Sequence, residues 1–96
     1  MEYLLLIHKN SESLPSESEW NEFFDRATST GMFKGGSQLG ATTVFGKEGI
    51  PKSTDYIGGF MRFETTDRSG LESLLADHPV VKNGGSIELI EMPKTS

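Results

Sequence analysis

The sequence has 96 residues, enough for a modest hydrophobic core, and we expect residues 1–96 to form a single domain. It contains no cysteine, which excludes disulfides and thiolate metal sites. Fourteen acidic residues against nine basic ones give a formal charge of -5, which disfavours binding to nucleic acid. The longest apolar run, Leu4 to Ile7, is far too short to cross a membrane, and no signal-peptide pattern follows Met1. We therefore expect a cytoplasmic protein without a nucleic-acid or membrane partner.

Apolar patterns predict a strand followed by a helix in the first third of the chain. Residues 3–7 form a continuous apolar run that is too short for a helix, which indicates a strand. Ser16 and Glu19 have the spacing of a capping box, so we expect a helix to begin there and to end at Gly31. One face of this helix carries apolar side chains at helical spacing: Trp20, Phe23, Phe24 and Ala27. We expect Phe23 and Phe24 in the core.

Residues 32–64 predict two strands and the loop between them. The first strand, residues 32–45, is expected to be irregular near its glycines, with residues 42–45 as its strongest strand formers. Residues 46–55 carry the glycine, proline and charges of a hairpin loop. Residues 56–64 resume strand character, and Gly58-Gly59 indicates a bulge or a close backbone approach.

A second helix and a last strand complete the prediction. Asp67 is a candidate cap for the helix, and Ser69 with Glu72 is an alternative capping box. Its apolar side chains are Leu71, Leu74 and Leu75. We expect Pro79 to end this helix, and residues 87–92 to form the fourth strand.

The order β-α-β-β-α-β predicts an α+β fold, in which two helices cover one face of a four-stranded antiparallel sheet. Alternation along residues 3–7 places Tyr3, Leu5 and Ile7 on one face and Leu4 and Leu6 on the other, so both faces are apolar. A single copy cannot bury both faces. We therefore expect a homodimer whose sheets pack through their uncovered faces.

Four segments in this order resemble the YCII-related, or DGPF-type, family of small bacterial proteins. They are residues 1–7, residues 41–44 (Ala-Thr-Thr-Val), residues 56–60 (Tyr-Ile-Gly-Gly-Phe), and His78-Pro79 followed by residues 84–89. The resemblance implies a ferredoxin-like fold that dimerises into an α+β barrel. It also implies mostly unassigned functions: some relatives are similar to enzymes of the muconolactone-isomerase or dehydrochlorinase kind with a His-Asp pair, and others accompany sigma factors.

The chain departs from this family at two functional places. The Asp-Gly-Pro-Phe signature is missing, and Lys52 to Asp55 occupies a shortened version of that hairpin. Residues 16–30 contain no histidine, although the enzymatic branch places one around the first helix. A catalytic pair therefore cannot be transferred position by position.

Two histidines limit any proton transfer by imidazole at neutral pH to His8 or His78. His8 ends the first strand on the side of Leu4 and Leu6, which directs it toward Arg62 or Glu64; it is otherwise an ordinary strand-end residue. His78 precedes Pro79 at the expected end of a helix, where it is either a catalytic candidate or a cation that caps that helix.

Asp55 and Tyr56 complete the candidates for proton transfer. Asp55 is a candidate to orient a histidine, and Tyr56 a candidate to donate a hydrogen bond to an oxyanion. Both are explained equally well as an exposed loop acid and an aromatic residue at the start of a strand.

The sequence thus favours a small dimeric protein that binds a small, partly apolar molecule in a cleft near the dimer interface. Trp20, Tyr56 and Arg62 are the candidate ligand-binding residues. The alternatives are a lyase or isomerase that uses a His/Asp pair, and a regulatory or interaction subunit. We expect no cofactor, and no metal because the two histidines do not have metal-ligand spacing.

Overall fold

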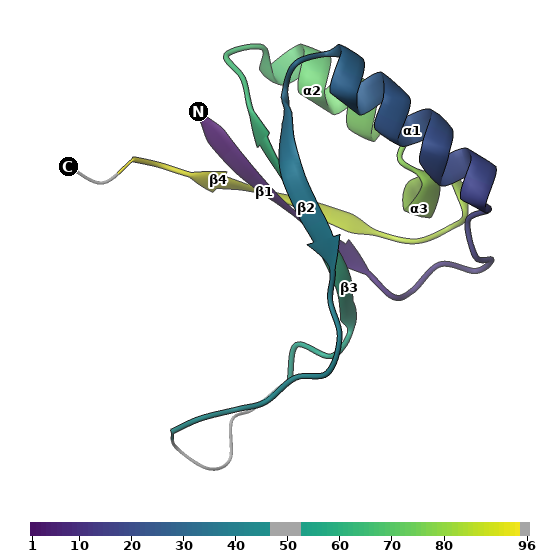
Figure 1. Ribbon diagram of the computed structural model, residues 1–96, viewed down its shortest axis with the longest axis vertical. Coiled ribbons are helices and arrows are strands. Elements are labelled where there is room, and N and C mark those ends of the chain that lie inside the picture. The colour runs from purple at the N-terminus through teal and green to yellow at the C-terminus, as the bar shows by residue number, and fades with distance from the viewer. Residues whose placement is uncertain (47–52, 95–96) are drawn as a thin grey trace.

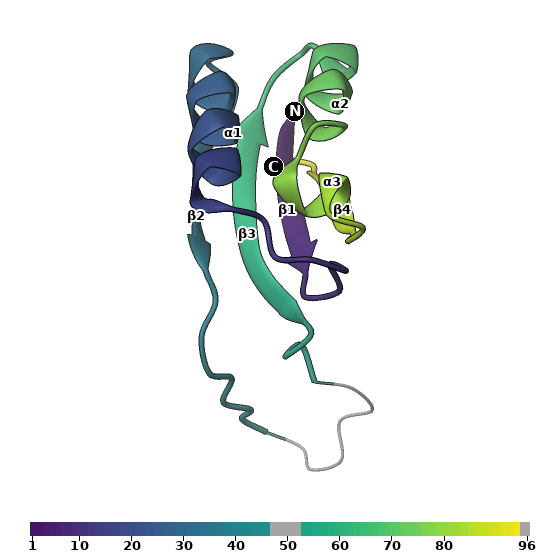
Figure 2. The same cartoon turned by 90° about the vertical axis from the view of Figure 1, so that its right-hand side faces the viewer.

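A computed structural model describes residues 1–46 and 53–94 and confirms the predicted α+β class (Figure 1). The elements in chain order are β1 (Glu2–His8), α1 (Glu17–Ser29), β2 (Phe33–Gln38), β3 (Ile57–Glu64), α2 (Arg68–Leu75), α3 (Pro79–Lys82) and β4 (Ile87–Met92). The four strands form one antiparallel sheet in the order β2-β3-β1-β4, and the helices cover one of its faces. Figure 2 shows α1 along the β2 side of the sheet and α2 and α3 along the β4 side. The ferredoxin-like arrangement is therefore present.

The core lies between the helices and the face of the sheet that they cover. Alternate residues of the two central strands are buried there, as the predicted parity requires: Tyr3 and Leu5 on β1, Met61 and Phe63 on β3. Helix α1 buries Phe23 and Ala27, and helix α2 buries its three leucines. Phe24 departs from the prediction, because 39% of its surface is exposed.

The predicted helix boundaries are set by local hydrogen bonds. Ser16 Oγ accepts the Glu19 N–H across 3.1 Å, and Glu19 Oε1 accepts the Ser16 N–H across 3.0 Å, which completes the capping box. Gly31 has φ 74° just after α1, where a left-handed residue ends a helix. Asp67 Oδ1 accepts the Gly70 N–H across 2.9 Å, so Asp67 is the cap of α2 and the alternative capping box is not used.

The second strand is shorter than predicted. Its irregularity is confirmed by a register shift between Phe33 and Gly35, but β2 ends at Gln38 and residues 42–45 form no strand. These residues leave the sheet (Figure 1), and Phe45 is 89% exposed. Strand propensity there has no effect because no partner strand lies alongside within the described residues. Residues 47–52 of the predicted loop lie outside the described part of the chain.

Pro79 has a different role from the one predicted. Helix α2 already ends at Leu75, and Pro79 begins the short helix α3, with His78 as its N-cap. Proline disfavours a helical conformation in the preceding residue but fits the first turn of a helix, where no intrahelical partner is needed for its missing N–H. The chain therefore restarts a helix at a position where we expected a loop.

The second face of the sheet carries no helix among the described residues. We call it the open face and define it by the apolar side chains of Leu4, Leu6, Phe60 and Ile90. Arg62 and Glu2 lie on the same face, with 3.8 Å between their charged groups. The prediction that β1 is apolar on both sides is thus confirmed.

Candidate functional site

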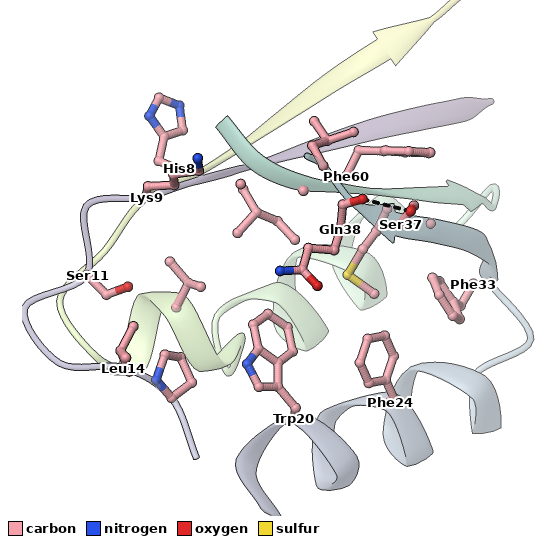
Figure 3. A pocket seen from close by; sticks show the side chains of 18 residues that line it. His8, Lys9, Ser11, Leu14, Trp20, Phe24, Phe33, Ser37, Gln38 and Phe60 are labelled. Carbon is pink, nitrogen blue, oxygen red and sulfur yellow. Dashed lines mark hydrogen bonds between the residues drawn. The ribbon is translucent and has the colours of Figure 1, made fainter. Parts of the chain in front are cut away.

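A cavity of about 770 Å³ lies on the helix-covered side of the sheet, between α1 and the adjoining ends of β2 and β3 (Figure 3). We call it the helix-side cavity. Most of its wall is apolar and comes from the sheet, α1, α3 and the loop after β1: Ile7, Leu14, Trp20, Phe24, Phe33, Met61 and Val80. The sequence predicts a cleft near the dimer interface. This cavity instead lies on the opposite side of the sheet from the open face.

Glycines leave the room for this cavity. Gly36 and Gly59 both line it, and the strand register places them on the helix-facing side beside Met61. A Cβ at Gly36 would lie 2.3 Å from the carbonyl oxygen of Phe60, and one at Gly59 would lie 3.1 Å from that of Ser37. Strand pairing therefore excludes a side chain at Gly36 and crowds one at Gly59. The part of the sheet that lines the cavity carries no side chain at these two positions.

Aromatic rings form the wall of the cavity opposite these two glycines. The rings of Trp20 and Phe24 are nearly parallel, with an interplanar angle of 26° and 5.8 Å between their centroids. Phe33 continues the row, 5.9 Å from Phe24. The partial exposure of Phe24 is explained by this position, since its ring faces the cavity and not the core.

Gln38 supplies a polar group to the lining of the cavity, and the residue is exposed to solvent. It pairs with Gly59 on the helix-facing side, and Figure 3 shows its side-chain amide reaching toward Trp20. Within residues 1–46 and 53–94 this amide has no hydrogen-bond partner. An amide both donates and accepts, so it fits a ligand with a hydroxyl or carbonyl group. Sequence reasoning missed Gln38 because no motif marks it.

The loop that carries Leu14 at the cavity mouth is held by hydrogen bonds to the segment before β4. Ser13 Oγ donates to Asn83 Oδ1 across 2.8 Å, and the Ser86 N–H donates to Asn10 Oδ1 across 2.8 Å. Asn10 Nδ2 in turn donates to Ser86 Oγ across 3.0 Å. Two asparagines thus fix a segment that has no secondary structure of its own.

His78 is fully buried and lies outside the lining of the cavity, next to Trp20. Its Nδ1 accepts the Val80 N–H across 3.1 Å, which makes it the N-cap of α3. Burial lowers the pKa of His78 from 6.5 to about 4, so the imidazole is neutral at pH 7. The interpretation of His78 as a cation that caps a helix C-terminus is therefore wrong: it caps an N-terminus, and it is uncharged.

His8 lies at the end of β1 and is one of the residues that line the cavity, but its imidazole ring points away from it (Figure 3). Its Nε2 is hydrogen-bonded to the Glu88 carboxylate on the neighbouring strand, and its ring lies 5.5 Å from that of Tyr56. The structure thus brings together two of the predicted site residues, His8 and Tyr56, and adds Glu88. The cross-strand register places Glu88 opposite Leu6, a pairing that sequence alone does not reveal.

The remaining candidates lie apart from this group. Asp55 is exposed, and its carboxylate has no hydrogen bond or ion pair within the described residues. Arg62 lies on the open face beside Glu2. Of the three predicted ligand-binding residues, only Trp20 lines the helix-side cavity.

Two further searches concern the described residues alone. No three histidine, aspartate or glutamate side chains gather there in a way that would hold a metal ion. No helix in residues 1–46 and 53–94 has the length and apolar character needed to span a membrane.

Comparison with known proteins shows a likeness in fold. No model of a known protein family matches the sequence, and no curated protein matches it. Among solved structures, the chain is similar to 5-chloro-2-hydroxyhydroquinone dehydrochlorinase (TftG) from Burkholderia phenoliruptrix AC1100, in complex with 2,5-dihydroxybenzoquinone. The TM-score is 0.50 at 15% sequence identity, and the match covers 99% of this chain and 96% of the other. This likeness supports the ferredoxin-like α+β fold over the whole chain.

Proposed function

We propose that this protein belongs with the YCII-related proteins and binds a small, partly apolar molecule in the helix-side cavity. The observation that carries the proposal is the cavity itself, whose 770 Å³ falls within the range of roughly 300 to 1,000 Å³ typical of small-molecule sites. Its wall is mainly aromatic and aliphatic, and Gln38 offers one adaptable hydrogen-bonding group. An apolar wall with few polar groups is the usual character of such sites.

A ring-shaped ligand is supported by the aromatic wall and by the neighbour in fold. Trp20 and Phe24 present two nearly parallel rings, against which a planar ligand gains stacking energy. The structure of TftG holds 2,5-dihydroxybenzoquinone, a single ring that the volume of the helix-side cavity can enclose. Its hydroxyl and carbonyl groups match what the Gln38 amide can donate and accept.

Isothermal titration calorimetry with 2,5-dihydroxybenzoquinone and hydroquinone tests this proposal. We expect at least one of the two to bind, and Phe24→Ala to weaken that binding by about 2- to 10-fold because one stacking ring is lost. Phe45→Ala is the matched control, since Phe45 is 89% exposed and does not line the cavity. Equal binding by Phe24→Ala and the unchanged protein would contradict the proposed site.

We also propose that two copies associate through their open faces. Leu4, Leu6, Phe60 and Ile90 form an apolar surface there that the described helices leave uncovered. Such a surface is typical of an interface between copies. The cytoplasmic location expected from the sequence remains a prediction.

A lyase or isomerase activity is the second candidate, and the contact between His8 and Glu88 favours it. A carboxylate that accepts a hydrogen bond from an imidazole sets the tautomer and the orientation of that ring. In this proposal His8 would remove a proton next to a carbonyl group, with Glu88 in the orienting role first considered for Asp55. His8→Gln and Glu88→Gln should each abolish turnover of an isomerisable lactone or chlorinated hydroquinone, and activity retained by both variants would exclude this role.

A further inference from the structure

We propose that His78 is a positioning residue for the helix-side cavity: its ring holds the indole of Trp20 in the orientation that forms the cavity wall. The consequence for ligand binding rests on the function proposed above, whereas the contact between the two rings does not. His78 itself touches no ligand in this proposal, because it lies behind the wall.

The backbone fixes His78 before its side chain makes any contact. Pro79 restricts the preceding residue to extended conformations, and His78 has φ -60° and ψ 135°. The Val80 N–H, which has no partner within its own helix turn, donates to Nδ1. Both the position and the rotation of the imidazole are therefore determined by the start of α3.

The same hydrogen bond sets the tautomer of the ring. Because Nδ1 is an acceptor, the single proton of the neutral imidazole is on Nε2. Nε2 is buried and has no hydrogen-bond partner among the described residues. A buried N–H without a conventional partner costs free energy, unless an aromatic face receives it.

Two aromatic rings surround the imidazole. The Phe23 ring lies 4.7 Å from it at 61°, and the Trp20 ring lies 5.2 Å from it at 90°, an edge-to-face arrangement. Phe23 is 2% exposed and anchors the imidazole to the core. Trp20 has one other aromatic contact in the described structure, with Phe24 of its own helix. His78 is therefore the aromatic contact that fixes the indole from outside α1.

The charges near His78 are already satisfied by other partners, which agrees with a neutral ring. Asp77 pairs with Arg26 across 3.0 Å, and Glu19 is hydrogen-bonded to Ser16 and Asn83. Within residues 1–46 and 53–94, no carboxylate is hydrogen-bonded to the imidazole. Its contribution to Trp20 is accordingly one of shape and ring packing.

Two substitutions of His78 distinguish the contact of its ring with Trp20 from its hydrogen bond that caps α3. His78→Asn keeps a side-chain oxygen that caps α3 but removes the ring, and His78→Phe keeps a ring but removes the acceptor. Trp20 is the only tryptophan of the chain, so its near-ultraviolet circular dichroism and its fluorescence anisotropy report its orientation and mobility directly. Both measurements are made on the full chain without ligand.

We expect His78→Asn to lose most of the tryptophan circular dichroism band and to lower the anisotropy, and His78→Phe to retain both signals. A role limited to capping predicts the reverse. Val81→Asn is the control, because it introduces the same residue on α3 at a position that is 38% exposed and does not line the cavity. Far-ultraviolet circular dichroism establishes that each variant is folded. If His78→Asn does not fold, His78→Leu fills the site with an apolar side chain and should lose the same signals.

Binding of 2,5-dihydroxybenzoquinone by the same variants adds the functional readout. We expect His78→Asn to bind about 2- to 10-fold more weakly than His78→Phe. A Trp20 signal retained by folded His78→Asn or His78→Leu, or lost by folded His78→Phe, overturns the positioning role. If the Trp20 signals behave as expected and no variant, nor the unchanged protein, binds the quinone, the proposed ligand class fails and the positioning role stands.

Discussion

The side-chain amide of Asn83 donates a hydrogen bond to Glu19 Oε2 across 2.9 Å, while the other oxygen of that carboxylate completes the capping box of α1. One carboxylate therefore joins α1 to the segment that follows α3. The Ser16 backbone N–H lowers the pKa of Glu19 most strongly, and the Asn83 side chain lowers it further. Since Asn83 also accepts from Ser13, this residue connects α1, α3 and the loop at the cavity mouth.

Asn83→Ala should destabilise the protein, because the part-buried Asn83 side chain makes several hydrogen bonds. The substitution removes hydrogen bonds to Glu19 and to the Pro79 carbonyl, 2.7 Å away, and leaves the Ser13 hydroxyl without its acceptor. We expect a loss of about 1 to 3 kcal/mol in the free energy of unfolding, measured by urea denaturation. Asn21→Ala is the control, since that asparagine is exposed on α1. Similar stabilities of the two variants would show that the Asn83 contacts contribute little.

Acidification should destabilise the protein in a window set by His78. Its pKa is 6.5 when unfolded and about 4 when folded, so between these values the unfolded state binds more protons and stability falls as the pH is lowered. The total loss is on the order of 3 kcal/mol and is nearly complete by pH 4. Urea denaturation of the unchanged protein and of His78→Phe at a series of pH values checks this. A slope that persists in His78→Phe would assign the effect to another group.

The stabilisation contributed by the Glu19 carboxylate is lost over a lower pH range than that of His78. Because its folded pKa lies below 4.5, the stabilisation by its carboxylate is present above that value and is lost as the pH falls through the folded pKa. His78→Phe should therefore retain this second, more acidic transition.

Gly36→Ala should weaken the pairing of β2 with β3. The new Cβ would lie 2.3 Å from the Phe60 carbonyl oxygen and 3.0 Å from the Met61 Cα, and both are backbone atoms that cannot rotate away. We expect destabilisation of roughly 2 to 3 kcal/mol and faster amide hydrogen exchange in β2. Gly40→Ala has open space around its Cβ and serves as the control. Unchanged exchange in Gly36→Ala would mean that β2 adapts without loss of pairing.

A charged substitution on the open face tests the proposed homodimer. Leu4 lies between Arg62 and Ile90 in the sheet, so Leu4→Lys would place a second cation beside Arg62 in the interface. Sedimentation velocity at micromolar concentration should show a dimer for the unchanged protein and a monomer for Leu4→Lys. Val81→Lys, on α3, should remain a dimer. A monomeric unchanged protein would exclude the assembly.

Short-range signals predicted most of the fold. The capping box at Ser16, the cap at Asp67 and the parity of β1 each involve residues close in sequence, and the structure confirms all three. The strand prediction for residues 42–45 is wrong because strand propensity takes effect only beside a partner strand, and the pairing of β2 with β3 ends at Gln38. The sequence does not distinguish a proline that ends one helix from a proline that begins the next, and Pro79 is of the second kind.

The candidate site was less accessible to sequence reasoning. Trp20 was identified from its helical spacing, but the cavity beside it depends on Gly36 and Gly59 facing the same side across two strands. The partner of His8 was missed for a similar reason, since Glu88 is 80 residues away and reaches it only through the register of β1 with β4. Contacts between distant residues follow from the sheet as a whole.

The position of β4 has a consequence for how the chain folds. Among the described strands β4 pairs only with β1, so the four-stranded sheet is incomplete until residues 87–92 pair with residues 2–7. Before that closure, β1 presents an unpaired backbone edge along a strand that is apolar on both sides. Such edges recruit other chains, and contacts between residues so distant form slowly. We infer that the interval before β4 docks is the time at which this protein is most prone to aggregate.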